Sequence, residues 1–268
     1  MEAPSPDVTV AARERVEPAG PNKLERCPTG IEALDNILGG GVPRGNMVLV
    51  SGSVGTGKTT LSLEFLVRGA ERGERGMLVS VTEATEKLVQ NLSTFEFFRP
   101  ELIADGSLVL VDLPALYEKL GFDREQLSSE DLDILLRSLH DLIRTLGIKR
   151  LVIDSLTSLG YRIQRDEHIR DFLLRLGEDL SEVGCTSLII SEIAPQTDRY
   201  SSRGVEEAIV DGIILLYNTR RLGDILRVLQ IVKMRGTAHS RALYVLELTP
   251  IGILMAPHLK GGRMNEGL

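Results

Sequence analysis

The sequence predicts an α/β protein in which a mostly parallel central sheet is flanked by helices and carries antiparallel strands at its C-terminal edge. Three observations support this fold class. Short apolar runs alternate with stretches whose apolar residues recur every three or four positions. A glycine-rich segment at 52–59 joins the first clear strand pattern to a helical stretch. From residue 209 onward, three apolar runs follow one another with only turns between them, which is typical of antiparallel strands.

The domain is expected to cover residues 23–257, between flexible tails at 1–22 and 258–268. The first tail is predicted from its prolines and few apolar residues. Helices are expected at 31–38, at 61–67, from about 85, at 132–146 and at 169–183. Strands are expected at 47–50, 77–81, 108–111, 151–153 and 188–190, and the antiparallel strands at 209–217, 225–232 and 243–248. The helix at 132–146 has the clearest pattern, with Ser128 or Ser129 as N-cap and Gly147 as its C-terminal stop.

The composition fits one globular domain. The chain has 268 residues, and 43% of them are hydrophobic, which is ample for a packed core. No apolar run approaches the ~18 residues that span a bilayer, and the polar start does not resemble a signal peptide. The net charge of −7 weighs against an extended basic face for nucleic acid. Cys27 and Cys185 lack metal-ligand spacing, so we expect reduced thiols and a cytoplasmic protein.

Residues Gly52 to Thr59 read G-S-V-G-T-G-K-T, which matches the phosphate-binding loop pattern of glycine, four residues, then Gly-Lys-Ser/Thr. The glycines let the backbone turn so that several N–H groups face one concavity, and the next helix adds its positive N-terminal end. Lys58 would reach the β- and γ-phosphates, and the Thr59 hydroxyl would hold Mg²⁺. We therefore expect ATP or a similar triphosphate to bind at Ser53, Gly55, Thr56, Gly57, Lys58, Thr59 and Thr60.

Two acidic residues complete this expectation. Asp154 ends an apolar strand, where active-site side chains emerge in open α/β sheets, and is the candidate partner of Thr59 at the metal. The alternative is that Asp154 or Ser155 only caps a helix. Glu83 closes the second strand and is the candidate catalytic base. The alternative is an acidic residue that favours the dipole of the next helix.

Five segments together resemble a single-domain member of the KaiC group of RecA-like P-loop ATPases. They are 29–35 with the glycines of 39–45, the loop at 52–59, the stretch 79–91, Asp-Ser-Leu-Thr at 154–157, and Gly-Val-Glu-Glu at 204–207 with Lys-Met-Arg-Gly-Thr-Ala-His at 233–239. The last segment is the most specific, because phosphate-binding loops occur in many families. The resemblance covers about residues 23–256, which is nearly the whole folded part.

The resemblance implies a ring, usually of six subunits, with ATP and Mg²⁺ bound between neighbours. Lys233 and Arg235 would reach the γ-phosphate held by the next subunit, with Met234, Thr237 and His239 lining the same pocket. Residues at i and i+2 of a strand project from one face, so the two cations can act together as an arginine finger does. The alternative is an edge strand protected by charge. The resemblance also places the hydroxyl of Thr94 near the base.

Two departures from the family pattern bear on activity. Relatives commonly have two adjacent glutamates after the second strand, whereas this chain has Thr82-Glu83, so either Glu83 serves alone or hydrolysis is slow. Where the phosphorylated repeat of clock proteins has a Ser-Thr pair, this chain has Glu207-Ala208, so autokinase activity is not expected.

Three functions remain open from the sequence. The first is a regulatory ATPase ring, with an unidentified protein partner. The second is a recombination-type ATPase that binds single-stranded DNA, which the acidic composition disfavours. The third is a nucleotide-gated scaffold with almost no turnover. Glu192 is placed to sense phosphate or to pass its state to the loop at 195–204. That loop carries Arg199, Tyr200 and Arg203; it would face the central channel and contact a partner or nucleic acid, or it is a solvated mobile loop.

Overall fold

A nine-stranded mixed sheet forms the centre of the computed structural model, which describes residues 24–122, 126–163 and 165–258. The strand order is β11-β10-β9-β8-β3-β7-β6-β4-β5. The parallel strands are β3 (Met47–Gly52), β4 (Gly76–Ser80), β5 (Leu108–Asp112), β6 (Arg150–Asp154), β7 (Thr186–Glu192) and β8 (Gly212–Arg221). The antiparallel edge continues from β8 through β9 (Asp224–Met234), β10 (Tyr244–Thr249) and β11 (Gly252–Pro257). The predicted fold class is confirmed.

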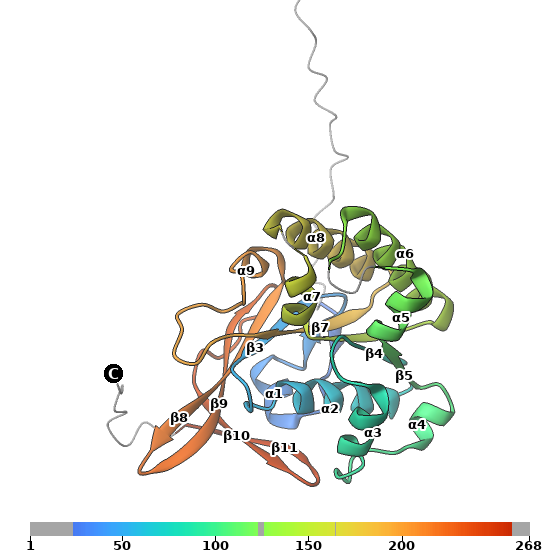
Figure 1. Cartoon of the computed structure of the whole chain (residues 1–268). Helices are drawn as coiled ribbons and strands as arrows, with labels where there is room; N and C mark the ends of the chain where they lie inside the picture. Colours follow the sequence, from blue (N-terminus) through green and yellow to red (C-terminus); the bar gives the residue numbers. More distant parts are fainter. Residues whose placement is uncertain (1–23, 123–125, 164, 259–268) are drawn as a thin grey trace, which may run out of the picture.

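Helices cover both faces of the parallel part of the sheet (Figure 1). The helices of one face are α5 (Leu113–Leu120), α6 (Ser129–Leu146), α7 (Leu156–Arg162) and α8 (Asp166–Glu182). Those of the other face are α1 (Glu32–Ile37), α2 (Lys58–Ala70), α3 (Thr85–Leu92) and α4 (Glu101–Ala104). A short helix, α9 (Glu206–Ile209), precedes β8, and a small antiparallel ribbon joins β1 (Arg26–Cys27) to β2 (Val42–Pro43).

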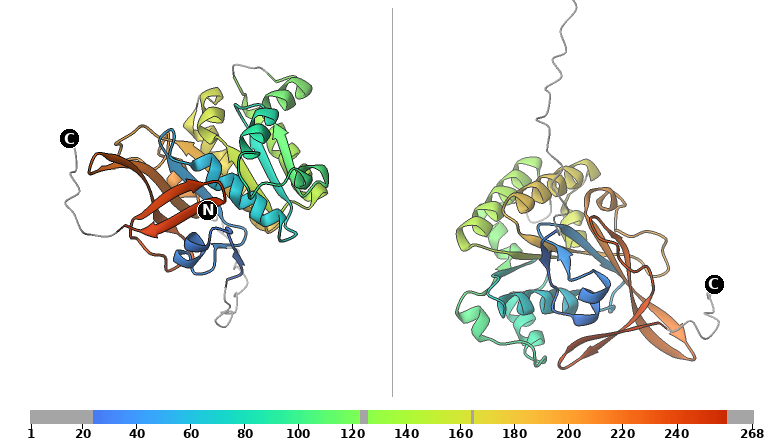
Figure 2. Two further views of the ribbon diagram at one scale, coloured as in Figure 1. Left: turned by 90° about the horizontal axis from the view of Figure 1, so that it is seen from below. Right: turned by 180° about the vertical axis from the view of Figure 1, so that it is seen from behind.

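Strand β3 lies in the middle of the sheet and is buried along its whole length. Met47 and Leu49 pack into the core under α6 and α8, whereas Val48 and Val50 pack into the core around α2. This alternation of side chains explains why the strand reads as a continuous apolar run. Figure 2 shows the same layers from below and from behind, with the β8–β9 hairpin extending past the helices.

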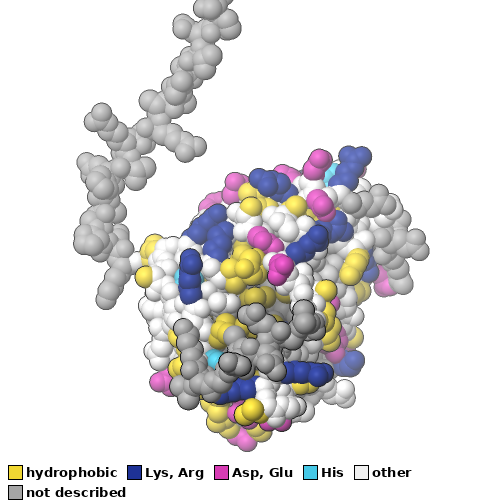
Figure 3. Space-filling model, turned by 90° about the vertical axis from the view of Figure 1, so that its left-hand side faces the viewer, with side chains coloured by type: hydrophobic (Ala, Val, Ile, Leu, Met, Phe, Trp, Pro, Cys, Tyr) yellow, Lys and Arg dark blue, Asp and Glu magenta, His cyan; other side chains and the backbone are white. Residues whose placement is uncertain are grey.

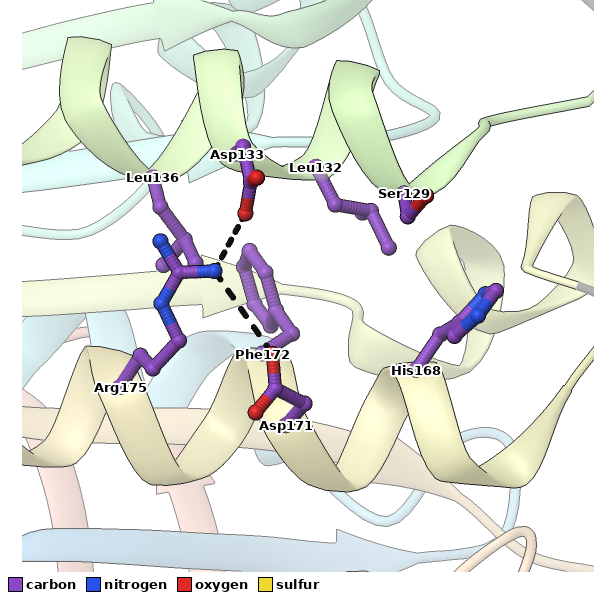
Figure 4. A pocket seen from close by; sticks show the side chains of 8 residues that line it. All are labelled: Ser129, Leu132, Asp133, Leu136, His168, Asp171, Phe172 and Arg175. Atoms are coloured by element: carbon purple, nitrogen blue, oxygen red, sulfur yellow. Dashed lines mark hydrogen bonds and ion pairs between the residues drawn. The ribbon is translucent and has the colours of Figure 1, made fainter.

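Helix α6 has the ends that the sequence predicts. Ser128 and Asp131 form a reciprocal capping box at its start, and Gly147 ends it at a φ of 64°. Its contact with α8 includes Arg175, which pairs with Asp133 of α6 and lies 3.6 Å from Asp171 (Figure 4). The cavity beside this ion pair has a volume of about 40 Å³, which is far too small for a nucleotide.

Several short elements were not anticipated. Helix α9 occupies 206–209, so β8 begins at Gly212 rather than at 209. Helices α4, α5 and α7 and strand β11 were not predicted. Short elements offer few apolar positions, so only some of them show a recognisable period, as α1 and α3 do. The predicted tail at 1–22, and that at 258–268 apart from His258, lie outside the described residues. Within the described residues, no helix is both long and apolar enough to cross a membrane.

Candidate nucleotide-binding site

The phosphate-binding loop lies between β3 and α2, and its shape depends on glycine. A Cβ on Gly52 would lie 2.2 Å from the carbonyl oxygen of Leu216 on the neighbouring strand. Gly55 and Gly57 have φ values of 78° and 96°, in the left-handed region that favours glycine. Gly57 directly precedes α2, so the loop opens onto the N-terminal end of that helix. Free backbone N–H groups at such an end form an anion site.

Polar groups of the loop contact one another. Lys58 Nζ donates to the carbonyl oxygen of Ser53 at 2.9 Å, and Thr56 Oγ1 donates to the same oxygen at 2.8 Å. Burial lowers the pKa of Lys58, while the nearby charges of Glu192 and Asp154 act in the opposite direction. The ammonium group is therefore held at the loop between acidic residues, where an anionic ligand would offset the cost of its burial. Thr60 follows on the first turn of α2 and is partly exposed.

Thr59 and Asp154 come together, as the sequence predicts. Thr59 Oγ1 donates to Asp154 Oδ2 at 2.8 Å, across the gap between α2 and the end of β6. Burial raises the pKa of Asp154, while the Thr59 hydrogen bond and the charge of Lys58 lower it. Among the described residues no three His, Cys, Asp or Glu side chains could share a metal ion. One hydroxyl and one carboxylate fit Mg²⁺, which takes few protein ligands and fills its shell with water and phosphate oxygens.

Two further acidic residues lie near this pair. Glu83 follows β4, and both Glu83 and Glu192 act to raise the pKa of Asp154. Glu83 is partly exposed; its carboxylate accepts a hydrogen bond from Asn91 Nδ2 at 3.3 Å and lies 3.6 Å from Lys87 Nζ. Glu192 ends β7 beside Gly52, and its backbone N–H donates to Thr157 Oγ1 at 2.7 Å. The end of the sheet that carries the loop is therefore rich in carboxylates.

Lys233 and Arg235 lie together, but not at the loop of their own chain. Lys233 Nζ donates to the carbonyl oxygens of Glu207 and Val210 at 3.0 and 2.7 Å. The guanidinium of Arg235 donates to two carbonyl oxygens of α9, those of Ala208 and Ile209, and pairs with Asp211 at 3.0 Å. Both cations thus bind the C-terminal end of α9, where the helix dipole favours positive charge.

The sheet register separates this basic pair from the loop. Met234 lies opposite Gly212, which lies opposite Val48 near the start of β3. The loop follows Gly52, which lies opposite Leu216. Four residues of strand at about 3.3 Å per residue place the backbone positions of the two groups roughly 13 Å apart along the sheet.

The remaining predicted residues are dispersed. The side chain of Met234 is buried against Gly212, and its carbonyl oxygen accepts a hydrogen bond from the backbone N–H of Thr237 at 3.3 Å. Thr237 Oγ1 accepts a hydrogen bond from Arg26, and His239 Nδ1 lies 3.2 Å from the carbonyl oxygen of Ser240. Thr94 Oγ1 donates to the carbonyl oxygen of Asn91 at the end of α3. Its neighbour Glu96 donates its backbone N–H to Pro250 O, which brings Thr94 close to the β10–β11 turn.

Sequence reasoning missed Arg227. Its Nε donates to the carbonyl oxygen of Gly55 at 3.1 Å, so a basic side chain from β9 touches the phosphate-binding loop. No motif marks this residue. The only available signal was strand alternation, which places Arg227 on the same face of β9 as Leu229.

The loop at 195–204 is bound to the rest of the chain at several points. Arg203 donates to Asp166 Oδ1 and to the carbonyl oxygen of Gly160, both at 2.6 Å, so this residue is not free for a ligand. Tyr200 is 37% exposed, and its backbone N–H donates to Glu207 Oε1. On the face shown in Figure 3, Lys and Arg side chains form separate groups, with apolar and acidic side chains between them.

Comparisons with known proteins identify the family of this chain. The family model of the KaiC ATPase matches residues 27–260. A UPF0273 protein of Pyrococcus furiosus is 36% identical over 248 residues, which cover 91% of this chain and 99% of that protein. The circadian clock oscillator protein KaiC of Synechococcus elongatus is 32% identical over 235 residues, which cover 87% of this chain and 44% of that protein.

A solved structure is also similar. The crystal structure of a KaiC-like protein from Pyrococcus horikoshii superposes with a TM-score of 0.75 at 33% sequence identity, covering 88% of this chain and all of that one. Family membership supports nucleotide binding and a general ATPase activity. A family model that spans nearly all the described residues, and relatives matched over almost their full length, place the chain in the single-domain KaiC-like family of RecA-type ATPases.

Proposed function

We propose that the chain is a slowly hydrolysing regulatory ATPase that works as a ring-shaped homo-oligomer, with six copies and with ATP bound between neighbouring subunits. One observation carries this proposal: the phosphate-binding loop, after β3, and the Lys233–Arg235 pair, at the end of β9, lie at opposite edges of the sheet. One molecule cannot apply both to one triphosphate. Residues 23–257 would form the single ATPase domain of each subunit.

Within one subunit, the loop from Ser53 to Thr60 would bind the phosphates, with Lys58 neutralising the β- and γ-phosphate charge. Thr59 and Asp154, 2.8 Å apart, would hold Mg²⁺, and the bound ion would neutralise the charge that develops during phosphoryl transfer. Thr94, beside the β10–β11 turn, would lie near the base.

Glu83 would act as the catalytic base. Support comes from its place after β4 and from its charge, which reaches Asp154. Its carboxylate is shared with Asn91 and Lys87, and Thr82 stands where relatives have a second glutamate. A base held by partners on the following helix α3 and lacking a second carboxylate fits slow turnover.

The neighbouring subunit would supply Lys233 and Arg235 to the γ-phosphate, with the backbone of Met234 and the side chains of Thr237 and His239 in the same pocket. In the single chain these cations bind the carbonyl oxygens of α9. A γ-phosphate carries full negative charge, whereas a carbonyl oxygen carries only a partial one, so the phosphate would compete well with these carbonyl oxygens. Arg235 would also have to exchange its ion pair with Asp211 for the phosphate. Glu207-Ala208 offers no hydroxyl there, so self-phosphorylation is not part of the proposal.

Mixing inactive variants tests the shared site. Lys58→Ala disables phosphate binding, and Arg235→Ala disables the donated cation. A randomly mixed ring has about a quarter of its interfaces formed by an intact loop and an intact Arg235, so about a quarter of wild-type activity should return. Mixtures that stay as inactive as either parent would show that Arg235 does not act across an interface.

Two measurements separate this proposal from its alternatives. The mass in solution, with and without ATP and Mg²⁺, should show a hexamer; a monomer under all conditions contradicts the ring. ATPase rates with and without single-stranded DNA at low salt should agree within about twofold. Stimulation of about tenfold or more would favour the DNA-binding ATPase, and no turnover at all would favour a nucleotide-gated scaffold.

A further inference from the structure

The turn that follows the basic pair is packed against the first strand of the domain. Gly236 has a φ of 72°, and a Cβ built on it would lie 2.6 Å from Cδ1 of Leu24. The backbone N–H of Arg235 donates to the carbonyl oxygen of Asp211, so the turn is also anchored next to β8. Residues 24–26 and 235–237 are therefore neighbours despite a separation of more than 200 positions in the sequence.

Arg26 is the polar link between these two segments. Its Nη1 donates to Thr237 Oγ1 at 2.5 Å, and its Nη2 donates to the carbonyl oxygen of Gly236 at 3.3 Å. The same Nη1 reaches the carbonyl oxygens of Leu38 and Gly41, at 3.4 and 3.3 Å, at the end of α1. Nη1 has two N–H groups for its three acceptors, so one of these hydrogen bonds is shared. The planar guanidinium still fixes the direction of its donors, which the flexible ammonium of a lysine does not.

The contact also decides what the Thr237 hydroxyl can do. A hydroxyl has two acceptor lone pairs and one proton to donate. Because Arg26 has no acceptor, Thr237 can only accept from it, and the Thr237 proton stays free for another acceptor. An anionic phosphate oxygen is the kind of acceptor that such a proton would bind.

We propose that Arg26 is a positioning residue for the donated side of the active site. It holds the turn that carries Arg235 and Thr237, and it makes Thr237 a hydrogen-bond donor toward the phosphates held by the next subunit. The inference rests on the proposed function, because it requires that the 233–239 segment acts on a neighbour's nucleotide. It predicts that replacing Arg26 in one subunit lowers the hydrolysis rate at the adjacent subunit's nucleotide site and leaves the rate at the nucleotide site of the replaced subunit unchanged.

The test uses the full-length chain. Arg26→Ala should lower kcat by about 10- to 100-fold, the cost of a misplaced catalytic group, while leaving the affinity for a fluorescent ATP analogue within about twofold. The matched control is Arg75→Ala, which removes another arginine bonded to a backbone oxygen, that of Leu146, far from the turn. Its kcat should stay within about twofold of wild type.

Subunit mixing then distinguishes positioning from a merely structural role. Arg26→Ala subunits contribute intact loops, and Lys58→Ala subunits contribute intact turns, so a random mixture should recover about a quarter of wild-type activity. If this mixture stays inactive while the mixture of Arg235→Ala and Lys58→Ala subunits recovers, the inference about Arg26 is wrong and the shared site stands. If neither mixture recovers, both fall.

A second pair of variants applies if Arg26→Ala does not fold. Thr237→Val should reproduce the loss of kcat, and Thr237→Ser should restore most of it, because serine keeps the hydroxyl. Where Arg26→Ala does fold, the double variant Arg26→Ala/Thr237→Val should be no slower than the slower single variant. Losses that multiply, or a Thr237→Val variant with wild-type kcat, would overturn the proposed coupling.

Discussion

Helix α2, which carries Lys58 and Thr59, is fixed to strand β6, which carries Asp154, by a contact at the other end of β6 from Asp154. Arg150 begins β6 and is fully buried. It lies 2.6 to 2.7 Å from the Glu74 carboxylate through two nitrogens, donates to the carbonyl oxygen of Phe65 at 2.8 Å and stacks over the Phe65 ring. Gly69 makes room for it, because a Cβ there would lie 2.2 Å from Cδ of Arg150 and 2.3 Å from Nε.

We predict that Gly69→Ala destabilises the protein. Alanine inside a helix is normally more stable than glycine by up to about 1 kcal/mol. Here the new methyl group would displace Arg150 from its buried ion pair, and breaking such a pair costs about 3–5 kcal/mol. The expected net loss in the free energy of unfolding is therefore roughly 2–4 kcal/mol, or a Tm lower by roughly 4–16 °C for a domain of this size.

The matched control is Gly177→Ala in α8. Its new Cβ would lie 3.3 Å from the flexible end of Met47, which can move by a few tenths of an ångström. The control should be neutral or more stable by up to about 1 kcal/mol. Urea unfolding followed by circular dichroism measures both variants. If Gly69→Ala is as stable as Gly177→Ala, Arg150 does not fix α2 in the way described.

Three further predictions concern the base, a buried acid and the thiols. Glu83→Gln should lower the ATPase rate at least about a hundredfold, the smallest typical contribution of a general base, and Thr82→Glu should raise it; an unchanged rate in Glu83→Gln excludes Glu83 as the base. Burial raises the pKa of Glu64 in α2, so the folded state binds a proton more readily and stability should fall as the pH rises from the unfolded pKa through the folded one. Glu64→Gln should flatten this dependence in urea midpoints measured from pH 4 to pH 8, and an equal slope in both proteins contradicts it. Burial raises the pKa of Cys185 to about 12 and also raises that of Cys27. A thiol reagent at pH 8 should therefore label neither cysteine at an appreciable rate until denaturant is added. Rapid labelling of the native protein would refute their burial.

The sequence was sufficient where local chemistry determines the structure. The backbone of the loop at 52–59 requires glycine at fixed positions, so the glycine pattern identifies the loop in the sequence. The ends of α6 could be predicted because Ser128, Asp131 and Gly147 satisfy its free backbone groups locally. The pairing of Thr59 with Asp154 could also be anticipated, because parallel strands bring their carboxyl ends to one edge of the sheet.

Contacts between segments distant in sequence could not be anticipated. Arg26 contacts Thr237 across 211 positions, and Arg227 contacts Gly55 across 172. In each case the sequence pattern predicts only a solvated charged residue on a strand, because the partner is identified by the three-dimensional topology and not by the local sequence. The docking of Lys233 onto α9 was missed for a related reason, since a helix of four residues leaves no periodic signal.

The phosphate-binding loop and the Lys233–Arg235 pair lie at opposite edges of the sheet, and this placement has a practical consequence. Under the proposed arrangement a monomer contains only part of each active site, so turnover per molecule would depend on the fraction of subunits that are assembled. Diluting the protein should then reduce its specific activity, and a cell could set the rate simply by setting the amount of protein it makes.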